Sequence, residues 1–153
     1  MPHAMSRHGR RPSYVRNCLI DSGPLIALFA VDDDYHARFD TLVKELSVNG
    51  LRLITTWPCI VEASYLLEIP HRFEMLEWIE LGGAAVYPFE SAHLGDFVRW
   101  MRRYSEAHKR EMDLADASLY WLAAETGVSE ILTVDITDFS RYRLPGGKAF
   151  TLL

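Results

Sequence analysis

Short apolar runs alternate with longer helical stretches along this chain, and the alternation is the feature that most constrains its fold. Residues 18–20 and 130–134 are two of these runs, and each is followed directly by an aspartate, Asp21 or Asp135. Short apolar runs are typical of buried strands, and strands that alternate with helices predict a mostly parallel sheet. Ligands bind such sheets beyond the carboxyl ends of the strands. We therefore expect Asp21 and Asp135 to lie at one edge of the sheet.

The boundaries of the expected elements follow from hydrophobic periodicity and from the residues that end each element. Strands are predicted at residues 17–20, 51–55, 84–87, 130–134 and 148–153. Helices are predicted at residues 24–31, 32–48, 72–81, 92–108 and 113–126, and one more begins after the N-cap Thr56. The acidic run 32–34 suits a helix N-terminus. The pattern predicts a three-layer α/β fold, in one domain at residues 17–153.

The charge of the chain is unevenly distributed. Residues 1–16 contain four arginines and no acid, and we expect them to form a flexible basic extension. The rest of the chain has 12 basic and 21 acidic residues. Nucleic-acid-binding domains are usually basic, so a net negative charge in such a domain has to be explained. Carboxylates that bind metal ions would explain it, because the bound cations reverse the local charge.

Nothing in the sequence predicts a membrane or secreted protein. The longest apolar run, residues 25–31, is too short to span a bilayer, and residues 1–16 lack the apolar segment of a secretory signal. The two cysteines, Cys18 and Cys59, lie in apolar surroundings and are interpreted as reduced core residues of a cytoplasmic protein, with a disulfide as the less favoured alternative.

Asp21 and Glu62 are the first two candidate site residues. Asp21 ends a buried strand, where a carboxylate is costly unless it is paired or binds a metal; helix capping is an equally good explanation of it. Glu62 stands among Ile60, Val61 and Ala63, which favours a buried, functional side chain over an exposed position on the helix.

Two pairs of acids follow later in the chain. Asp113 and Asp116 are three residues apart, so they share one helix face, where like charges repel unless a cation or the helix N-terminus compensates. We interpret Asp113 as the N-cap and Asp116 as a metal ligand. Asp135 ends its strand, whereas Asp138 is treated as secondary and is expected to cap a short turn.

The donor set of these candidates indicates a hard cation. Carboxylates without a matching histidine or cysteine cluster favour Mg²⁺ or Mn²⁺ over zinc. The six histidines have no ligand spacing, and neither a glycine-rich phosphate loop nor a Gly-x-Ser-x-Gly nucleophile motif is present.

Four short motifs in this order resemble those of the PIN-domain family. They are Asp21-Ser22, Val61-Glu62-Ala63, Asp116-Ala117-Ser118-Leu119 and Thr133-Val134-Asp135. Each is weak alone, but their order and spacing are specific, and the resemblance covers residues 17–153. It is strongest to the VapC toxins of bacterial toxin–antitoxin pairs. Ser22 stands where the family often has threonine, which keeps the hydroxyl.

The resemblance carries implications for fold, activity and partners. It implies a five-stranded parallel sheet in the order 3-2-1-4-5 and hydrolysis of RNA with Mg²⁺ or Mn²⁺. It implies metal binding by Asp21, Asp116 and Asp135, with Glu62 as the fourth catalytic acid. It also implies a cognate antitoxin protein and a homodimer.

Basic residues near the middle of the chain are candidates for contacts with RNA phosphates. They lie in the predicted helix 92–108 or just after it, interleaved with Trp100 and Tyr104: Arg99, Arg102, Arg103, Lys109 and Arg110. Contact with phosphates is one interpretation, and an ordinary solvated helix face, with Glu106 as an ion-pair partner, is the other.

Two other classes of function remain open from the sequence. One is a catalytically weak module on the same scaffold that binds RNA or a protein. The other is a phosphatase or receiver domain, which also uses strand-end aspartates. The phosphatase is disfavoured because Gly23 stands where its second acid belongs, and the receiver domain because no acid follows the third strand before Glu90.

Overall fold

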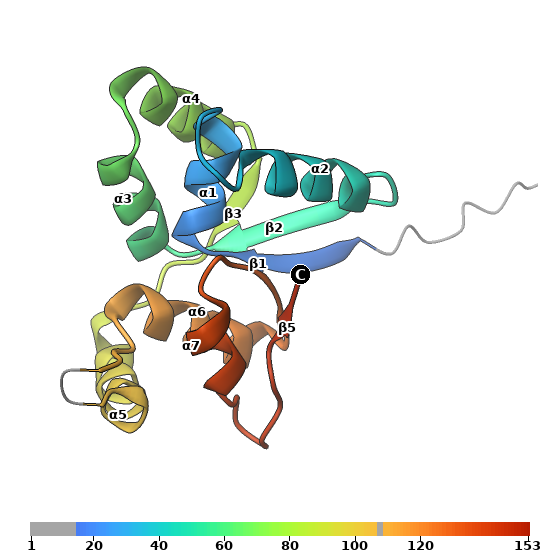
Figure 1. Ribbon diagram of the computed structural model, residues 1–153. Coiled ribbons are helices and arrows are strands. Elements are labelled where there is room, and N and C mark those ends of the chain that lie inside the picture. The colour runs from blue at the N-terminus through green and yellow to red at the C-terminus, as the bar shows by residue number, and fades with distance from the viewer. Residues whose placement is uncertain (1–14, 107–108) are drawn as a thin grey trace, which may run out of the picture.

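The computed structural model describes residues 15–106 and 109–153, and Figure 1 shows its helices and strands. Residues 1–14 of the expected basic extension lie outside the described residues. Arg16, which we placed in that extension, is instead the first residue of strand β1 (Arg16–Ile20). Its backbone N–H donates to the Gly50 carbonyl at 3.0 Å, and its guanidinium lies 2.6 Å from the Glu130 carboxylate. The strand therefore begins one residue earlier than predicted.

Helices and strands alternate through the rest of the chain. After β1 come α1 (Ser22–Phe29), α2 (His36–Ser47), β2 (Leu51–Thr55), α3 (Trp57–Leu66), α4 (Ile69–Glu80) and β3 (Ala84–Val86). The second half contains the 3-10 helix η1 (Ser91–His93), α5 (Leu94–Tyr104), α6 (Leu114–Thr126), β4 (Glu130–Leu132), α7 (Ile136–Arg141) and β5 (Thr151–Leu152).

The five strands form one parallel sheet in the order β3-β2-β1-β4-β5, which confirms the predicted topology. Strand β1 is central. Cys18 lies opposite Leu53 of β2, and Ile20 lies opposite Leu132 of β4. Segments more than 100 residues apart in the sequence therefore meet side by side at the middle of the sheet.

Helices cover both faces of the sheet, so the fold has the three layers that we predicted. Helices α1 to α4 lie on one face and α5 to α7 on the other (Figure 1). The last three residues of β1 are completely buried between the layers, which explains why this strand is a continuous apolar run. No helix in the described part of the chain is long and apolar enough to cross a membrane.

Several boundaries differ from the predictions for local reasons. Helix α2 begins at His36 rather than at residue 32, because the Asp33 carboxylate accepts a hydrogen bond from the Tyr35 N–H (2.9 Å) and forms a turn before the helix. Helix α4 begins at Ile69 instead of residue 72, with a proline in its first turn. Helix α7 was expected only as a short turn. Cys18 and Cys59 are buried free thiols, so the alternative of a disulfide is wrong.

Candidate metal centre

Asp21 occupies the junction between strand β1 and helix α1, and 6% of its surface is exposed. Its Oδ1 accepts a hydrogen bond from the Ser22 N–H at 2.8 Å, which caps the helix. Its Oδ2 accepts a hydrogen bond from the Thr133 hydroxyl at 2.9 Å. Asp21 is therefore the helix cap that one interpretation of the sequence predicted, and its second oxygen is bonded to the segment that follows β4.

Thr133 connects the two strand-end aspartates, a role that we did not assign from the sequence. Its Oγ1 accepts a hydrogen bond from the Asp135 N–H at 3.0 Å. Because that N–H can only donate, the hydroxyl hydrogen of Thr133 is left to donate to Asp21. The Asp21 N–H in turn donates to the Leu132 carbonyl at 3.0 Å. The prediction that Asp21 and Asp135 share one edge of the sheet is thus confirmed.

Asp113 and Asp116 lie at the start of helix α6 and have different roles. Asp113 is the N-cap, as predicted, and its Oδ1 accepts a hydrogen bond from the Asp116 N–H at 2.8 Å. Asp116 is 7% exposed and points from the first turn of this buried helix. Its Oδ2 accepts a hydrogen bond of 2.7 Å from the Tyr142 hydroxyl.

Helix α7 supplies two more carboxylates. Asp135 is its N-cap and accepts a hydrogen bond from the Asp138 N–H at 3.2 Å. Asp138 lies in the first turn and forms an ion pair with Arg141 at 3.0 Å. Carboxylate oxygens of Asp116, Asp135 and Asp138 all lie within 4.8 Å of one another. Asp138, which we treated as secondary, therefore belongs to the tightest group of acids, and Asp21 lies beside that group.

Glu62 is exposed, so the argument that predicted its burial is wrong. Helix α3 buries Cys59, Ile60 and Ala63 on its inner face, which turns Val61 and Glu62 outward. Glu62 nevertheless lies on the side of the site, because its charge contributes to a raised pKa of Asp21. Its exposure separates it from the buried acids Asp21 and Asp116.

The electrostatics of the site disfavour its negative charges in the absence of a cation. Burial, together with the charge of Asp113, raises the pKa of Asp116 to about 8. Burial also raises the pKa of Asp21 to about 6, against the opposing effect of its two hydrogen-bond donors. The pKa of Asp135 is raised by burial and by its neighbour Asp138. A bound cation would remove this penalty by favouring the charged carboxylates.

The donor set fits a hard divalent cation. The tight group contains carboxylate oxygens alone, which suits Mg²⁺ or Mn²⁺. Cys59 lies nearby, with its Sγ 3.9 Å from the Asp21 Oδ1, and burial raises the pKa of this thiol. Because thiolates suit soft metals and carboxylates suit hard ones, one thiol beside several carboxylates leaves the preference for oxygen-seeking metals unchanged.

The predicted basic helix is only partly confirmed. Arg99, Arg102 and Arg103 are exposed on α5, and Arg99 forms an ion pair with Asp96 one turn earlier. The helix ends at Tyr104, so Lys109 and Arg110 are not on it; His108, its predicted last residue, lies outside the described residues. The chain leaves the helix because Glu106 pairs with Arg110 in a small antiparallel bridge. The five cations therefore do not form one helical face.

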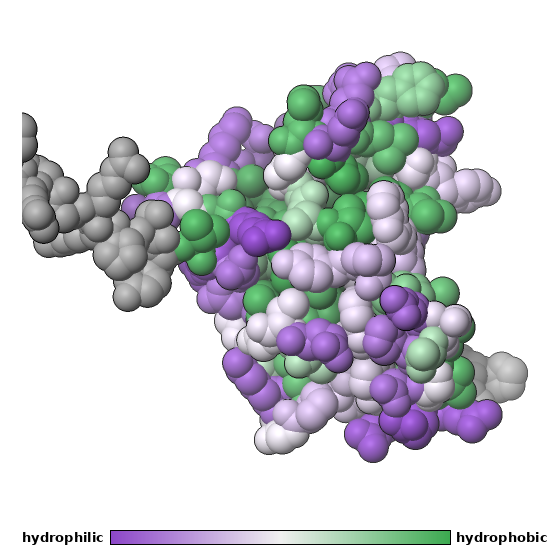
Figure 2. All heavy atoms as spheres, turned by 180° about the vertical axis from the view of Figure 1, so that it is seen from behind, coloured by the Kyte–Doolittle hydropathy of each residue, from purple (hydrophilic) through white to green (hydrophobic). Residues whose placement is uncertain are grey.

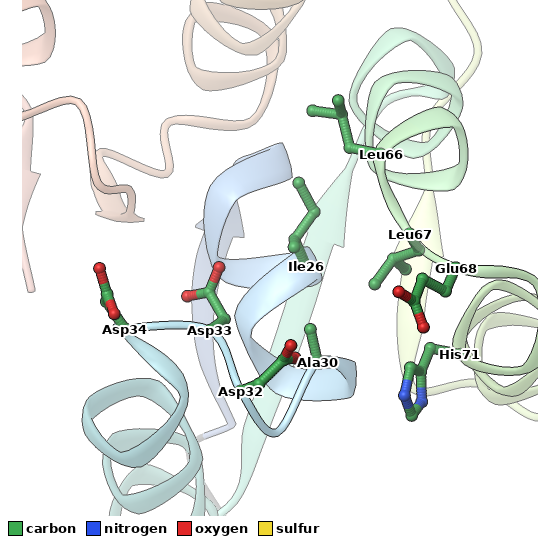
Figure 3. Close-up of a pocket in the computed structure, with 9 residues that line it drawn as sticks. All are labelled: Ile26, Ala30, Asp32, Asp33, Asp34, Leu66, Leu67, Glu68 and His71. Atoms are coloured by element: carbon green, nitrogen blue, oxygen red, sulfur yellow. The ribbon is translucent and has the colours of Figure 1, made fainter.

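An acidic concavity lies at the C-terminal end of α1, whereas Asp21 caps its N-terminal end (Figure 3). It is formed by the turn before α2 and the junction of α3 with α4, and its lining includes Asp32, Asp33, Asp34, Glu68 and His71. These carboxylates do not approach one another as the three at the sheet edge do, and the His71 side chain is 34% exposed. Because this concavity lies at the far end of α1, it is separate from the group formed by Asp116, Asp135 and Asp138.

Comparison with known proteins identifies the fold. No protein-family model matches the sequence, and no curated protein sequence matches it significantly. Among solved structures, VapC20 of Mycobacterium tuberculosis, described as a sarcin–ricin loop cleaving toxin, is similar with a TM-score of 0.66 and 16% identity. The likeness covers 79% of this chain and 92% of that one. Together with the sheet order 3-2-1-4-5 and its two helical layers, it shows that this chain has the PIN-like α/β/α fold of VapC-type toxins.

Proposed function

We propose that this protein is a metal-dependent endoribonuclease of the PIN-domain family and the toxin of a toxin–antitoxin pair. The observation that carries the proposal is the group formed by Asp116, Asp135 and Asp138 at the carboxyl edge of the sheet. This is the edge at which parallel α/β sheets bind ligands. A chain of the same fold, VapC20, is described as a toxin that cleaves the sarcin–ricin loop, which supports RNA as the substrate class.

The residues divide into those that hold a cation and those that arrange them. Asp116, Asp135 and Asp138 would hold Mg²⁺ or Mn²⁺, with Asp21 adjoining them. When bound, such an ion polarises a phosphoryl oxygen and lowers the pKa of a bound water. Thr133 fixes the orientation of Asp21 by a hydrogen bond. Glu62, exposed on α3, is free to accept a proton from water beside the scissile phosphate.

The exposed arginines of α5 are the remaining candidates for phosphate contacts. Arg102 and Arg103 both project from its last turn. Neutral substitutions at these two positions should weaken binding of every RNA sequence alike, as expected of contacts to the backbone. Lys109 and Arg110 belong to a separate segment after the helix and are candidates independently of it.

The proposed partners are an antitoxin and a second copy of the chain. Helices α3 and α4 expose apolar side chains at helical spacing: Trp57, Val61 and Tyr65 on the first helix, and Ile69, Phe73 and Leu76 on the second. We call these six residues the apolar face. A set of large apolar side chains exposed in this way is typical of a surface that binds another protein, and we propose that partner chains bind here.

A cleavage assay tests the proposed activity. The wild-type protein should cleave total RNA, or an oligonucleotide with the sarcin–ricin loop sequence, when Mn²⁺ is present and not when it is chelated. Asp116→Asn should reduce cleavage below detection, because it removes a charged ligand and keeps the size of the side chain. Sequencing of the products would define the cleavage site.

Asp40→Asn is the matched control, because Asp40 is a half-exposed acid on α2 whose one ion pair within the described residues is with Lys44. It should cleave RNA at the wild-type rate. Cleavage by Asp116→Asn at the wild-type rate would overturn the assignment of the site. Binding of RNA by the wild type without any Mn²⁺-dependent cleavage would support the alternative, a catalytically weak module that binds RNA or protein.

A further inference from the structure

Tyr142 is a completely buried tyrosine directly after helix α7, and its hydroxyl reaches into the candidate metal centre. The hydroxyl donates to the Asp116 Oδ2 at 2.7 Å. A phenol carries one O–H donor, which this bond uses. No hydrogen bond in the described part of the chain ends on the other oxygen of Asp116, Oδ1. One oxygen is thus anchored, and the other is available to a cation.

The ring of Tyr142 has little freedom to move. It meets the rings of Phe139 and Tyr104 edge to face, each with centroids 5.1 Å apart, and the Arg141 guanidinium lies 5.3 Å from its centre. Rings packed in this way hold the phenol oxygen in one position. The position of the hydroxyl is therefore set by packing and does not depend on its hydrogen bond with Asp116.

The neighbouring backbone is also tied to the helices on this face of the sheet. The Arg143 carbonyl accepts a hydrogen bond from the Tyr120 hydroxyl at 2.5 Å and from the Tyr104 hydroxyl at 3.1 Å. The Arg141 guanidinium donates to the Tyr104 carbonyl at 2.7 Å. These contacts dock residues 141–143 onto α5 and α6, so Tyr142 is placed by several independent interactions.

The three acids of the tight group come from two separate elements. Asp135 and Asp138 are both on α7, whereas Asp116 is on α6. Tyr142 ends α7 and bonds to Asp116, so its hydroxyl joins the two elements at the point where the acids converge. Partners of this kind, behind a metal ligand, orient the ligand and tune its affinity for the metal.

We propose that Tyr142 is a positioning residue for the metal centre, holding Asp116 in register with Asp135 and Asp138. This inference rests on the proposed function, since it requires that the acids bind a divalent cation. Tyr142 touches neither substrate nor metal. Its contribution is to fix the rotation of one carboxylate, so that a single defined oxygen faces the cation.

The test is a titration of Mn²⁺ into the intact protein, followed by electron paramagnetic resonance, which reports binding without any cleavage. Tyr142→Phe keeps the packed ring and removes only the hydroxyl. We expect the dissociation constant for Mn²⁺ to rise by about 10- to 100-fold, the usual effect of removing such a partner. Circular dichroism would verify that the variant is folded.

Tyr87→Phe is the matched control. Tyr87 is a half-buried tyrosine that packs against the core and directly follows β3, which β2 and β1 separate from β4. It should bind Mn²⁺ within twofold of the wild type. The inference is overturned if Tyr142→Phe also binds within twofold, or if both variants weaken binding equally. Failure of the wild-type protein to bind Mn²⁺ or cleave RNA would instead overturn the proposed function.

Discussion

The protonation of Asp116 makes the stability of the metal-free protein depend on pH. The pKa of its carboxyl group is raised to about 8, with burial as the largest cause, so the folded protein without metal holds this proton more tightly than the unfolded chain does. The stabilising effect of the proton is complete below the ordinary pKa of 3.8 and is lost as the pH rises through about 8. Metal-free protein should therefore lose stability across this range.

Asp116→Asn tests this pH dependence in the metal-free protein. An asparagine stays neutral and can still accept the hydrogen bond from Tyr142, so the variant should be the more stable protein at pH 8.5. The gain in free energy of unfolding should be at least about 1.4 kcal/mol, the equivalent of one pKa unit. At pH 4 the difference should largely disappear. Urea unfolding in the presence of a chelator measures both values, and equal stabilities at pH 8.5 would contradict the prediction.

The residues that the sequence could predict are those whose role follows from local position. Asp21 directly follows the buried strand β1, Asp135 lies just beyond β4 as the N-cap of α7, and Asp113 caps α6, so each was accessible from its neighbours in the chain. Thr133 and Tyr142 were not, because their hydroxyl groups act on residues 112 and 26 positions away. Glu62 was wrongly expected to be buried, since an apolar neighbourhood in sequence does not say which side of a helix faces the core.

At the scale of elements, the close approach of α1 to the end of β4 holds the two strand-end acids together. A Cβ atom added at Gly23, in the first turn of α1, would lie 2.5 Å from the Val134 Cγ2. Val134 stands between Thr133 and Asp135, so any displacement of it disturbs both. Glycine is required at position 23 because a larger side chain would collide with Val134. From the sequence alone, Gly23 indicated only that the second acid of a phosphatase site is missing.

Gly23→Ala should therefore destabilise the protein by about 1–3 kcal/mol, the usual cost of overpacking. Its Mn²⁺ affinity should also fall, because the end of β4 moves. Val134→Ala removes the side-chain atoms that clash, so the double variant should recover most of the stability lost by Gly23→Ala. The free energies of unfolding of the wild type, the two single variants and the double variant, measured by chemical denaturation, complete a double-mutant cycle. Strictly additive losses would show that the two residues do not compete for space.

The elements themselves were predictable in order and type, and less so in their ends. The five strands and their flanking helices follow from hydrophobic periodicity, which depends on many residues at once. Helix α7 escaped prediction because six residues offer too short a pattern. The end of α5 at Tyr104 depends on a bridge between Glu106 and Arg110, which no periodicity of the helix records.

At the scale of the whole molecule, the apolar face is the surface at which we propose that partner chains bind. Figure 2, which views the molecule from behind, shows hydrophobic residues exposed in several places over its upper part, whereas hydrophilic residues predominate below. Within the apolar face, Tyr65 is 82% exposed and Phe73 is 57% exposed. Side chains of this size in water favour association.

We expect the wild-type protein to form a dimer in solution, and Tyr65→Glu to shift it toward the monomer, because a charge at the centre of an apolar contact opposes its burial. Light scattering after size-exclusion chromatography, at several concentrations, measures the change. Val48→Glu is the control, since Val48 is 80% exposed at the end of α2, away from the apolar face. A wild type that is monomeric at every concentration would contradict the prediction.

The pairing of β1 with β4 also determines when the site can exist during synthesis. Asp21 leaves the ribosome well before its partner Thr133, which lies 112 residues further along the chain, and before the acids of α7. A nascent chain can form the first three strands and most of the helices while its carboxylates remain separated. Because contacts between distant segments also form slowly, the complete site can assemble only after β4 and α7 have joined the first three strands. A growing or truncated chain that lacks residues 133–142 has neither Thr133, nor the two acids of α7, nor Tyr142, so we expect it to be inactive.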